Sequence, residues 1–207
     1  MRPLVKICGV TRTEDAELVA ELGADFVGFN FYPGSPRCVT LGAARELGRA
    51  LSGSGVRTVG VFVNRPPDEV DRLADELELD LLQFHGDEGP AQLARYRARA
   101  IKVFRRVPPP VPEVLAAYSE VWGFLFDLPK AGEFGGSGSA WDYRAVAGVE
   151  VAPRRLLVAG GIGPDNARSA LVASGADGID LCSRIESAPG IKDRALLRAL
   201  FEELSHG

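Results

Sequence analysis

The chain alternates short strand-like runs with amphipathic stretches, and the alternation repeats eight times along 207 residues. Several of the strand-like runs are almost continuously apolar, as in 156–159, and such runs are typical of parallel strands covered on both faces. The predicted strands are Val5–Cys8, Asp25–Phe31, Thr58–Val63, Asp80–His85, Ala100–Phe104, Gly123–Asp127, Arg155–Ala159 and Gly178–Cys182.

Three of the intervening stretches carry clear helix signals. Thr13–Leu22 is expected to begin with Thr13 as its cap, because acidic Glu14 and Asp15 follow in the first turn. Pro66–Leu79 begins with proline, and Asn166–Ala173 follows another proline.

Eight strand–helix units in so short a chain leave no room for large insertions. The fold class predicted is therefore α/β, a single (β/α)8 TIM barrel with short loops, forming one domain over residues 1–207. A doubly wound open sheet is the alternative, which the absence of a break before a second domain makes less favourable.

Composition narrows the possible partners. The net charge of −4 and the pI near 5.3 argue against binding to nucleic acid or to an anionic membrane surface. No apolar run approaches the roughly 20 residues of a membrane span, and the start lacks a secretory signal. Cys8, Cys38 and Cys182 are widely spaced, which predicts neither a disulfide framework nor a metal site and favours the cytoplasm.

In a barrel, the carboxyl ends of all strands lie on one face, where active sites form. Cys8 ends the first predicted strand, Asp127 ends the sixth, and Arg37 lies in the loop after the second. A thiol can act as a base or nucleophile near neutral pH, and a carboxylate that ends an apolar strand is costly without a role. His85 is either a structural histidine or a substrate contact.

Three later segments have the composition of phosphate cradles. Glycines let backbone N–H groups approach an oxyanion, and barrels commonly bind phosphate after strands seven and eight. The residues expected to contact an anionic, phosphate-bearing substrate are Gly135, Gly136, Gly138, Gly160, Gly161, Asp180, Ser183 and Arg184.

Collinear strings from residue 4 to about 195 resemble the phosphoribosylanthranilate isomerase family of tryptophan biosynthesis. The strings are Lys6–Gly9, Gly28–Tyr32, Ser35–Arg37, Gly60–Asn64, Gln83–Glu88, Phe126–Asp127, Gly135–Gly138, Ala159–Gly161 and Glu186–Asp193.

The resemblance implies an isomerase that converts N-(5-phosphoribosyl)anthranilate into 1-(2-carboxyphenylamino)-1-deoxyribulose 5-phosphate by an Amadori rearrangement. By the same resemblance, Cys8 is the general base, Asp127 is the general acid and Arg37 holds the anthranilate carboxylate. Neither a cofactor nor a metal is implied, and the family pattern allows a monomer or a homodimer. The sequence departs from the family pattern at Leu128, Ser139, Cys182 and Arg184.

Two other functions remain open at this point. The aminoaldose isomerase of histidine biosynthesis performs the same chemistry with two aspartates, so a cysteine at position 8 argues against it. A non-catalytic phosphate-binding barrel is the other, and the presence of Cys8, Asp127 and Arg37 together argues against it.

Overall fold

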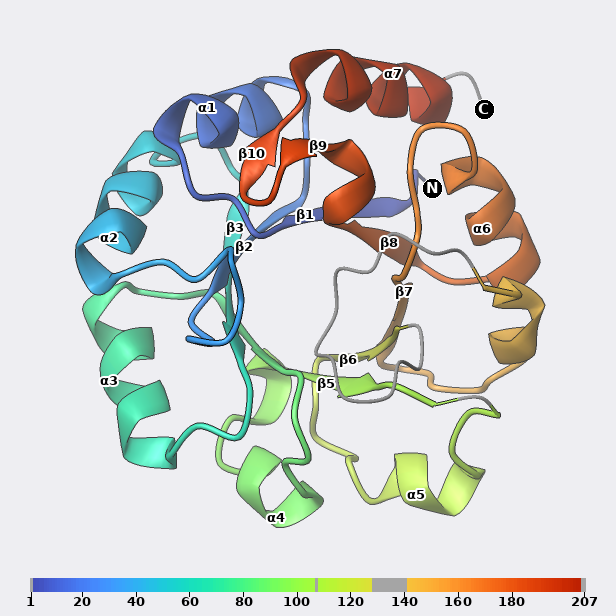
Figure 1. Ribbon diagram of the computed structural model, residues 1–207. Coiled ribbons are helices and arrows are strands. Elements are labelled where there is room, and N and C mark those ends of the chain that lie inside the picture. The colour runs from blue at the N-terminus through green and yellow to red at the C-terminus, as the bar shows by residue number, and fades with distance from the viewer. Residues whose placement is uncertain (1, 107, 128–140, 206–207) are drawn as a thin grey trace.

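The computed structural model describes residues 2–106, 108–127 and 141–205. Eight parallel strands form a closed barrel, in which β1 is hydrogen-bonded to both β2 and β8 (Figure 1). The predicted barrel is confirmed, and the alternative of an open sheet is wrong. The strands are β1 (Leu4–Cys8), β2 (Phe26–Asn30), β3 (Arg57–Phe62), β4 (Leu81–Phe84), β5 (Ala100–Phe104), β6 (Gly123–Phe126), β7 (Arg155–Val158) and β8 (Gly178–Leu181).

The α-helices surround the strands (Figure 1). The helix predicted from Pro66 ends earlier than expected, since Glu78 takes a positive φ of 49° that a helix does not allow. Thr13 is the first helical residue of its helix and not the cap; Arg12 occupies the cap position without a side-chain cap bond. The helices are α1 (Thr13–Glu21), α2 (Leu41–Ala50), α3 (Pro67–Glu76), α4 (Pro90–Leu93), α5 (Pro112–Ala116), α6 (Ala167–Ser174) and α7 (Arg194–Ser205).

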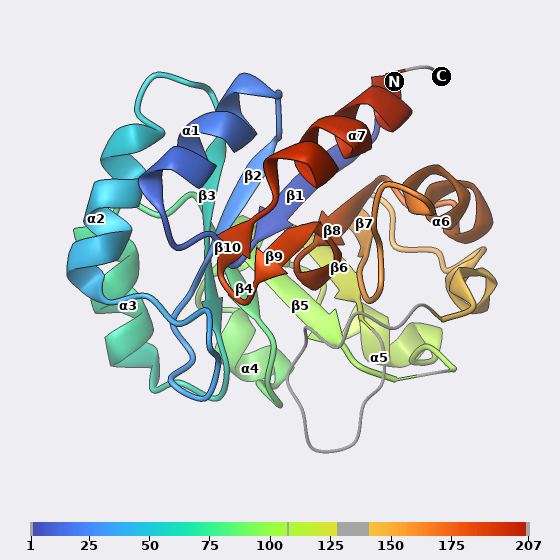
Figure 2. The same cartoon turned by 45° about the horizontal axis from the view of Figure 1, so that its top comes forward.

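Shorter elements complete the described chain. Three 3-10 helices are η1 (Arg97–Arg99), η2 (Tyr143–Val146) and η3 (Ser183–Ile185). In the described part of the connection between β6 and β7, η2 stands where the repeating pattern predicts an α-helix. After η3, β9 (Glu186–Ala188) and β10 (Ile191–Lys192) form a small antiparallel sheet beside β1 and β8 (Figure 2).

Side chains alternate between two apolar cores, one inside the barrel and one between strands and helices. In β1, Val5 and Ile7 belong to the outer core, whereas Leu4 packs against the inner one. Because the strand period is two, Lys6 and Cys8 point inward with Leu4. The inner core consists of Phe26, Val59, Leu81, Ile101, Val103, Leu125, Leu157 and Ala159.

An aromatic cluster closes the amino-terminal end of the barrel. The rings of Phe26 and Trp122 meet edge to face with centroids 5.4 Å apart, and the Arg57 guanidinium lies 4.2 Å from the Phe26 centroid. Both arrangements are favourable for aromatic rings. With apolar residues filling this end, the inward-facing polar residues are left to the carboxyl-terminal end.

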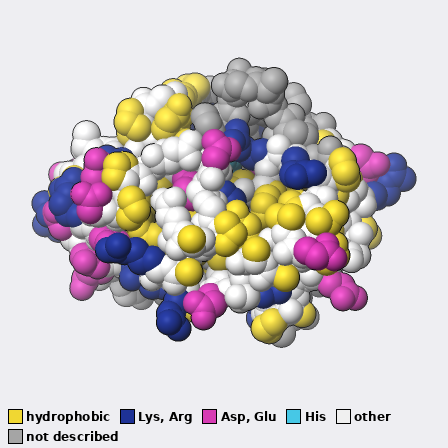
Figure 3. Space-filling model, turned by 90° about the horizontal axis from the view of Figure 1, so that it is seen from below, with side chains coloured by type: hydrophobic (Ala, Val, Ile, Leu, Met, Phe, Trp, Pro, Cys, Tyr) yellow, Lys and Arg dark blue, Asp and Glu magenta, His cyan; other side chains and the backbone are white. Residues whose placement is uncertain are grey.

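The outer surface carries both signs of charge. On the face shown in Figure 3, Lys and Arg side chains are interspersed with Asp and Glu. Within the described ranges, no helix is long and apolar enough to cross a membrane.

Side chains of the inner core should contribute strongly to stability. Leu125 has no exposed surface, so Leu125→Ala should lower the free energy of unfolding by about 2–5 kcal/mol through lost burial and a cavity. Val172 on α6 is 79% exposed, and Val172→Ala should change the free energy of unfolding by less than about 0.5 kcal/mol. Urea denaturation of both variants measures the difference; equal effects would contradict the assignment of Leu125 to a packed core.

Candidate active site

The thiol of Cys8 lies beside a buried ammonium group at the carboxyl end of β1. Lys6, on the same face of the strand, is completely buried, and its Nζ lies 2.8 Å from Oδ1 of Asp180. Position 28 must be glycine for this arrangement, because a Cβ there would lie 2.9 Å from Cys8 Sγ and 3.2 Å from Lys6 Nζ. Gly28 therefore makes room for the thiol and the ammonium group to approach one another.

These neighbours determine the ionisation of Cys8. A hydrogen bond from the Cys182 thiol lowers the pKa of Cys8 well below its ordinary value, burial opposes the shift, and the charges of Lys6 and Lys192 reinforce it. Burial opposes the charged form of Lys6, but Asp180 and Cys8 raise its pKa. A thiolate at position 8 therefore faces a lysine that stays charged, the environment typical of reactive cysteines.

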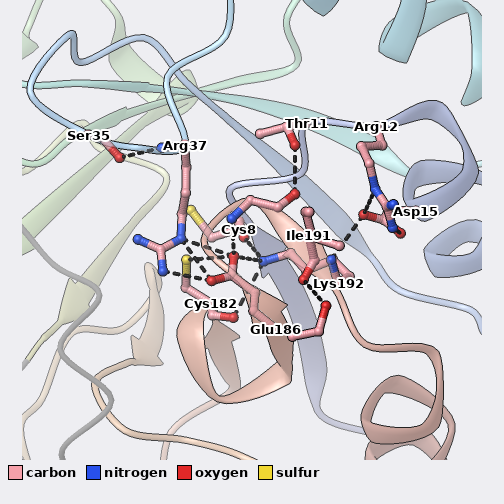
Figure 4. A network of polar contacts seen from close by, with 12 residues as sticks. Cys8, Thr11, Arg12, Asp15, Ser35, Arg37, Cys182, Glu186, Ile191 and Lys192 are labelled. Atoms are coloured by element: carbon pink, nitrogen blue, oxygen red, sulfur yellow. Dashed lines mark hydrogen bonds and ion pairs between the residues drawn. The ribbon is translucent and has the colours of Figure 1, made fainter.

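Arg37 is held by a carboxylate that also binds a buried lysine (Figure 4). Its Nε lies 3.0 and 3.1 Å from the two Glu186 oxygens, and its Nη2 lies 2.6 Å from Oε2. Lys192 Nζ donates to Glu186 Oε1 at 2.8 Å and to the Cys8 carbonyl oxygen at 2.6 Å. The expected clamp residue is thus fixed in place by Glu186, with its Nη1 outside these bonds.

Asp127 follows β6 and is buried next to an imidazole ring. Its Oδ2 lies 3.3 Å from Nε2 of His85, and Nδ1 of His85 lies 3.1 Å from Nε2 of Gln83. Nδ1 is thus the ring nitrogen that pairs with Gln83, and Nε2 is the one that faces Asp127. His85 is therefore a neighbour of the carboxylate, at the same end of the barrel as Cys8.

In the loop after β7, the carbonyl groups of Gly160 and Gly161 accept hydrogen bonds from neighbouring side chains. Tyr143 Oη donates to the Gly160 carbonyl at 2.6 Å, and Asn166 Nδ2 donates to that of Gly161 at 2.9 Å. Gly160 has a φ of +83°, which favours glycine. Among the described residues, none accepts a hydrogen bond from the N–H of Gly160 or Gly161. Two backbone donors are thus available to an anion, and their binding of phosphate stays a prediction.

Arg184 and Ser183 lie in η3, beside this loop. Arg184 Nη1 donates to the Gly161 carbonyl at 3.1 Å, and its Nη2 bonds Asp165 Oδ2 at 2.9 Å. Arg184 is therefore a partly exposed residue at the rim, whose carboxylate partner is Asp165. Ser183 begins η3 at the end of β8.

Asp180 lies inside the barrel and not in a loop, as the partner of Lys6. Burial raises the pKa of Asp180 to about 7 although Lys6 opposes the shift, and the charges of Cys8 and Asp127 add to it. The structure thus brings Asp180 to the thiol and the carboxylate. The predicted contacts of Gly135, Gly136 and Gly138 lie outside the described residues.

Sequence reasoning did not assign roles to Lys6, Gly28, Glu186 or Lys192. For Lys6 a signal was present, because a lysine two residues before Cys8 in a predicted strand must share its face. Glu186 and Lys192 occur in β9 and β10, whose position above the barrel depends on tertiary packing. Within the described ranges, no group of three or more His, Cys, Asp or Glu residues could hold a metal ion.

Comparisons with known proteins agree on one family. The family model described as N-(5'phosphoribosyl)anthranilate (PRA) isomerase matches residues 5–203. A protein of Bordetella pertussis named N-(5'-phosphoribosyl)anthranilate isomerase is 41% identical over 208 residues, which cover 97% of this chain and 94% of that protein.

Solved structures of the same name share the fold. The phosphoribosyl anthranilate isomerase of Thermus thermophilus has a TM-score of 0.86 and 40% identity, with 98% of each chain covered. A second such structure, in complex with reduced 1-(o-carboxyphenylamino)-1-deoxyribulose 5-phosphate, has a TM-score of 0.82 and 30% identity, again over 98% of each chain.

The buried Glu186 predicts a pH dependence of stability. Burial opposes its ionisation, but the hydrogen bonds from Arg37 and the charge of Lys192 hold the pKa of Glu186 below its ordinary value. A lowered pKa contributes stability above the unfolded pKa of about 4.3, and this is lost as the pH falls through the folded pKa. Glu186→Gln should therefore be less stable than the native chain at neutral pH, with a difference that shrinks as the pH falls below the unfolded pKa.

Urea denaturation at a series of pH values measures this difference. Glu17→Gln is the matched control, because Glu17 is exposed on α1 and makes none of these contacts. A difference between Glu186→Gln and the native chain that stays constant over the whole range would show that the Glu186 charge does not stabilise the fold.

Proposed function

Because this chain belongs to the N-(5′-phosphoribosyl)anthranilate isomerase family, we propose that its buried thiol and carboxylate carry out an Amadori rearrangement as base and acid. The reaction is the isomerisation of N-(5-phosphoribosyl)anthranilate to 1-(2-carboxyphenylamino)-1-deoxyribulose 5-phosphate in tryptophan biosynthesis. The observation that carries the assignment of roles is the Cys8 thiol beside Lys6, with a lowered pKa, at the end of the barrel where Asp127 also lies.

The first step opens the furanose ring. The Asp127 carboxyl group donates a proton to the ring oxygen as the bond from that oxygen to C1′ breaks, and the anthranilate nitrogen supplies the electrons that form the Schiff base. Nε2 of His85 faces Asp127 Oδ2 at 3.3 Å, and we assign to it the stabilisation of the carboxylate that remains. Burial of both groups strengthens this interaction.

The second step is taken by the Cys8 thiolate. It removes the proton from C2′, whose acidity the adjacent iminium increases, and the C–H electrons form the enolamine. The enol then tautomerises to the ketone product. One proton has been donated to the substrate and one removed from it, so the product is an isomer. Cys8 is then a thiol and Asp127 a carboxylate, and loss of a proton from Cys8 to water with gain of one by Asp127 restores the enzyme.

Other residues are proposed to hold the two ends of the substrate. The Nη1 group of Arg37, which lies outside the bonds to Glu186, is assigned to the anthranilate carboxylate. The N–H groups of Gly160 and Gly161, with Ser183 and Arg184 beside them, are assigned to the phosphate, together with the loop at 135–138. We further propose that the chain forms a single domain, that it acts in the cytoplasm, and that it is a monomer or a homodimer.

The direct experiment is to supply N-(5-phosphoribosyl)anthranilate and follow the loss of anthranilate fluorescence. The expected result is turnover without added metal or cofactor. The aminoaldose substrate of histidine biosynthesis serves as the comparison, and a preference for it would favour the second isomerase. A folded sample that turns over neither substrate would instead indicate a phosphate-binding barrel.

The role of Cys8 is tested by Cys8→Ala. A base acts mainly in the transition state, so kcat should fall at least on the order of 100-fold while binding of a reduced product analogue changes only a few-fold. Cys38→Ala is the matched control, since Cys38 is an exposed thiol away from the barrel interior. Near-native kcat in Cys8→Ala would eliminate the assignment.

The role of Asp127 is tested by Asp127→Asn, which keeps the shape of the side chain and removes the acid. We expect kcat to fall at least on the order of 100-fold with little change in thermal stability. Binding of the reduced, open-chain product analogue should be retained, because that molecule requires no ring opening. Loss of analogue binding equal to the loss of kcat would point to a general structural role.

A further inference from the structure

Cys8 ends β1, and Cys182 directly follows the neighbouring strand β8, so the two cysteines lie next to each other. The register of β1 and β8 pairs Lys6 with Asp180 and Ile7 with Leu181, so Cys8 and Cys182 occupy the next position. Parallel strands lie about 4.8 Å apart, and side chains at one register position on one face meet. Lys6 and Asp180, the pair two residues earlier on the same face, are in such contact, with 2.8 Å between Nζ and Oδ1.

Further contacts hold the two cysteines together. Lys192 Nζ donates to the carbonyl oxygens of Cys8 at 2.6 Å and Cys182 at 3.4 Å, which joins the two strand ends. A hydrogen bond from Cys182 is the largest cause of the lowered pKa of Cys8, and Figure 4 shows the two side chains close to each other. Gly9 lets Cys182 and Arg37 pack closely against it, because a Cβ there would lie 3.2 Å from Cys182 Sγ and 2.6 Å from Arg37 Cδ.

The proton of Cys182 has a second acceptor within reach, but a poorer one. Glu186 Oε1 lies 4.0 Å from Cys182 Sγ, at the outer limit for a sulfur donor. That oxygen already accepts hydrogen bonds from Arg37, Lys192 and the Gly190 N–H. The Cys8 sulfur, which Lys6 and Lys192 help to keep as a thiolate, is therefore the better acceptor for the Cys182 proton.

We propose that Cys182 is a positioning residue for the base: its S–H group donates to the Cys8 sulfur and holds it as an oriented thiolate. The proposal rests on the role of Cys8 given above. In the resting enzyme the pair of sulfur atoms holds one proton. When Cys8 takes the substrate proton, both become thiols, and release of that proton restores the pair. Because a thiol is a weak donor, Lys6 and Lys192 share the stabilisation.

Matched variants at position 182 test the donor. Cys182→Ser keeps a hydroxyl donor, whereas Cys182→Ala removes it with little change in volume. In Cys182→Ala, the acidic limb of the pH profile of kcat/KM should move upward by about one pH unit, so that activity near neutral pH falls about tenfold and recovers in alkali. Cys182→Ser should remain close to the native profile.

A second measurement does not depend on turnover. The chain has three cysteines, so in a Cys38→Ala background Cys182→Ala leaves Cys8 as the only thiol. Its alkylation by iodoacetamide should be about tenfold slower near neutral pH than in the Cys182→Ser counterpart, because less of it is thiolate. This measurement fails only if the pairing is wrong, whereas absent turnover with normal alkylation would overturn the proposed function instead.

A third measurement needs no change at position 182. In Cys38→Ala alone, thiolate absorbance in the ultraviolet should rise in two separate steps, one well below and one well above the ordinary cysteine pKa of about 8.5. Two thiols that titrate together near that value would overturn the proposal.

In the alkylation experiment, identical rates for Cys182→Ala and Cys182→Ser would also overturn it.

Discussion

The closure of the barrel between β1 and β8 determines the arrangement of the site. A fixed register in a parallel pair decides which side chains meet, and here it aligns Lys6 with Asp180. A slip by one residue would turn Lys6 and Cys8 outward into the apolar layer beneath the helices. Lys6 and Asp180 can be buried where β1 meets β8 because they form an ion pair with each other. The same pairing therefore defines one register and brings the thiol to its place.

The charge balance around the thiol follows from three buried cations. Lys6, Lys192 and Arg37 are buried at this end of the barrel, whereas the carboxylates they bind are those of Asp180 and Glu186. The positive charges of these three side chains stabilise an anion at this end, whether a thiolate or the carboxylate of a substrate. A site of this kind is organised before any ligand arrives, which lowers the energetic cost of forming charge in the reaction.

Much of this arrangement could be predicted from the sequence, because it depends on local periodicity. The eight strands lie where their apolar runs predict them, each end within one residue of the observed one, since a strand buried on both faces has a strong sequence signature. The positions of Cys8 and Asp127 at one end of the barrel follow directly. The cap of α1 and the η2 connection could not be predicted, because tertiary contacts override weak local preferences there. Glu186 and Lys192 were missed for a related reason: their partners are distant in sequence, and Lys192 meets the Cys8 carbonyl only after the whole barrel has closed.

The two tryptophans of the chain stand at opposite ends of the barrel axis. Trp122 packs on Phe26 in the apolar closure, whereas the indole N–H of Trp141 donates to the carbonyl oxygen of Ala159 at 2.9 Å, next to the glycine loop after β7. A variant that keeps only one of them would therefore report on one end of the barrel alone. With Trp122 alone, emission would report on the packing of the barrel, and with Trp141 alone it would report on the loop after β7.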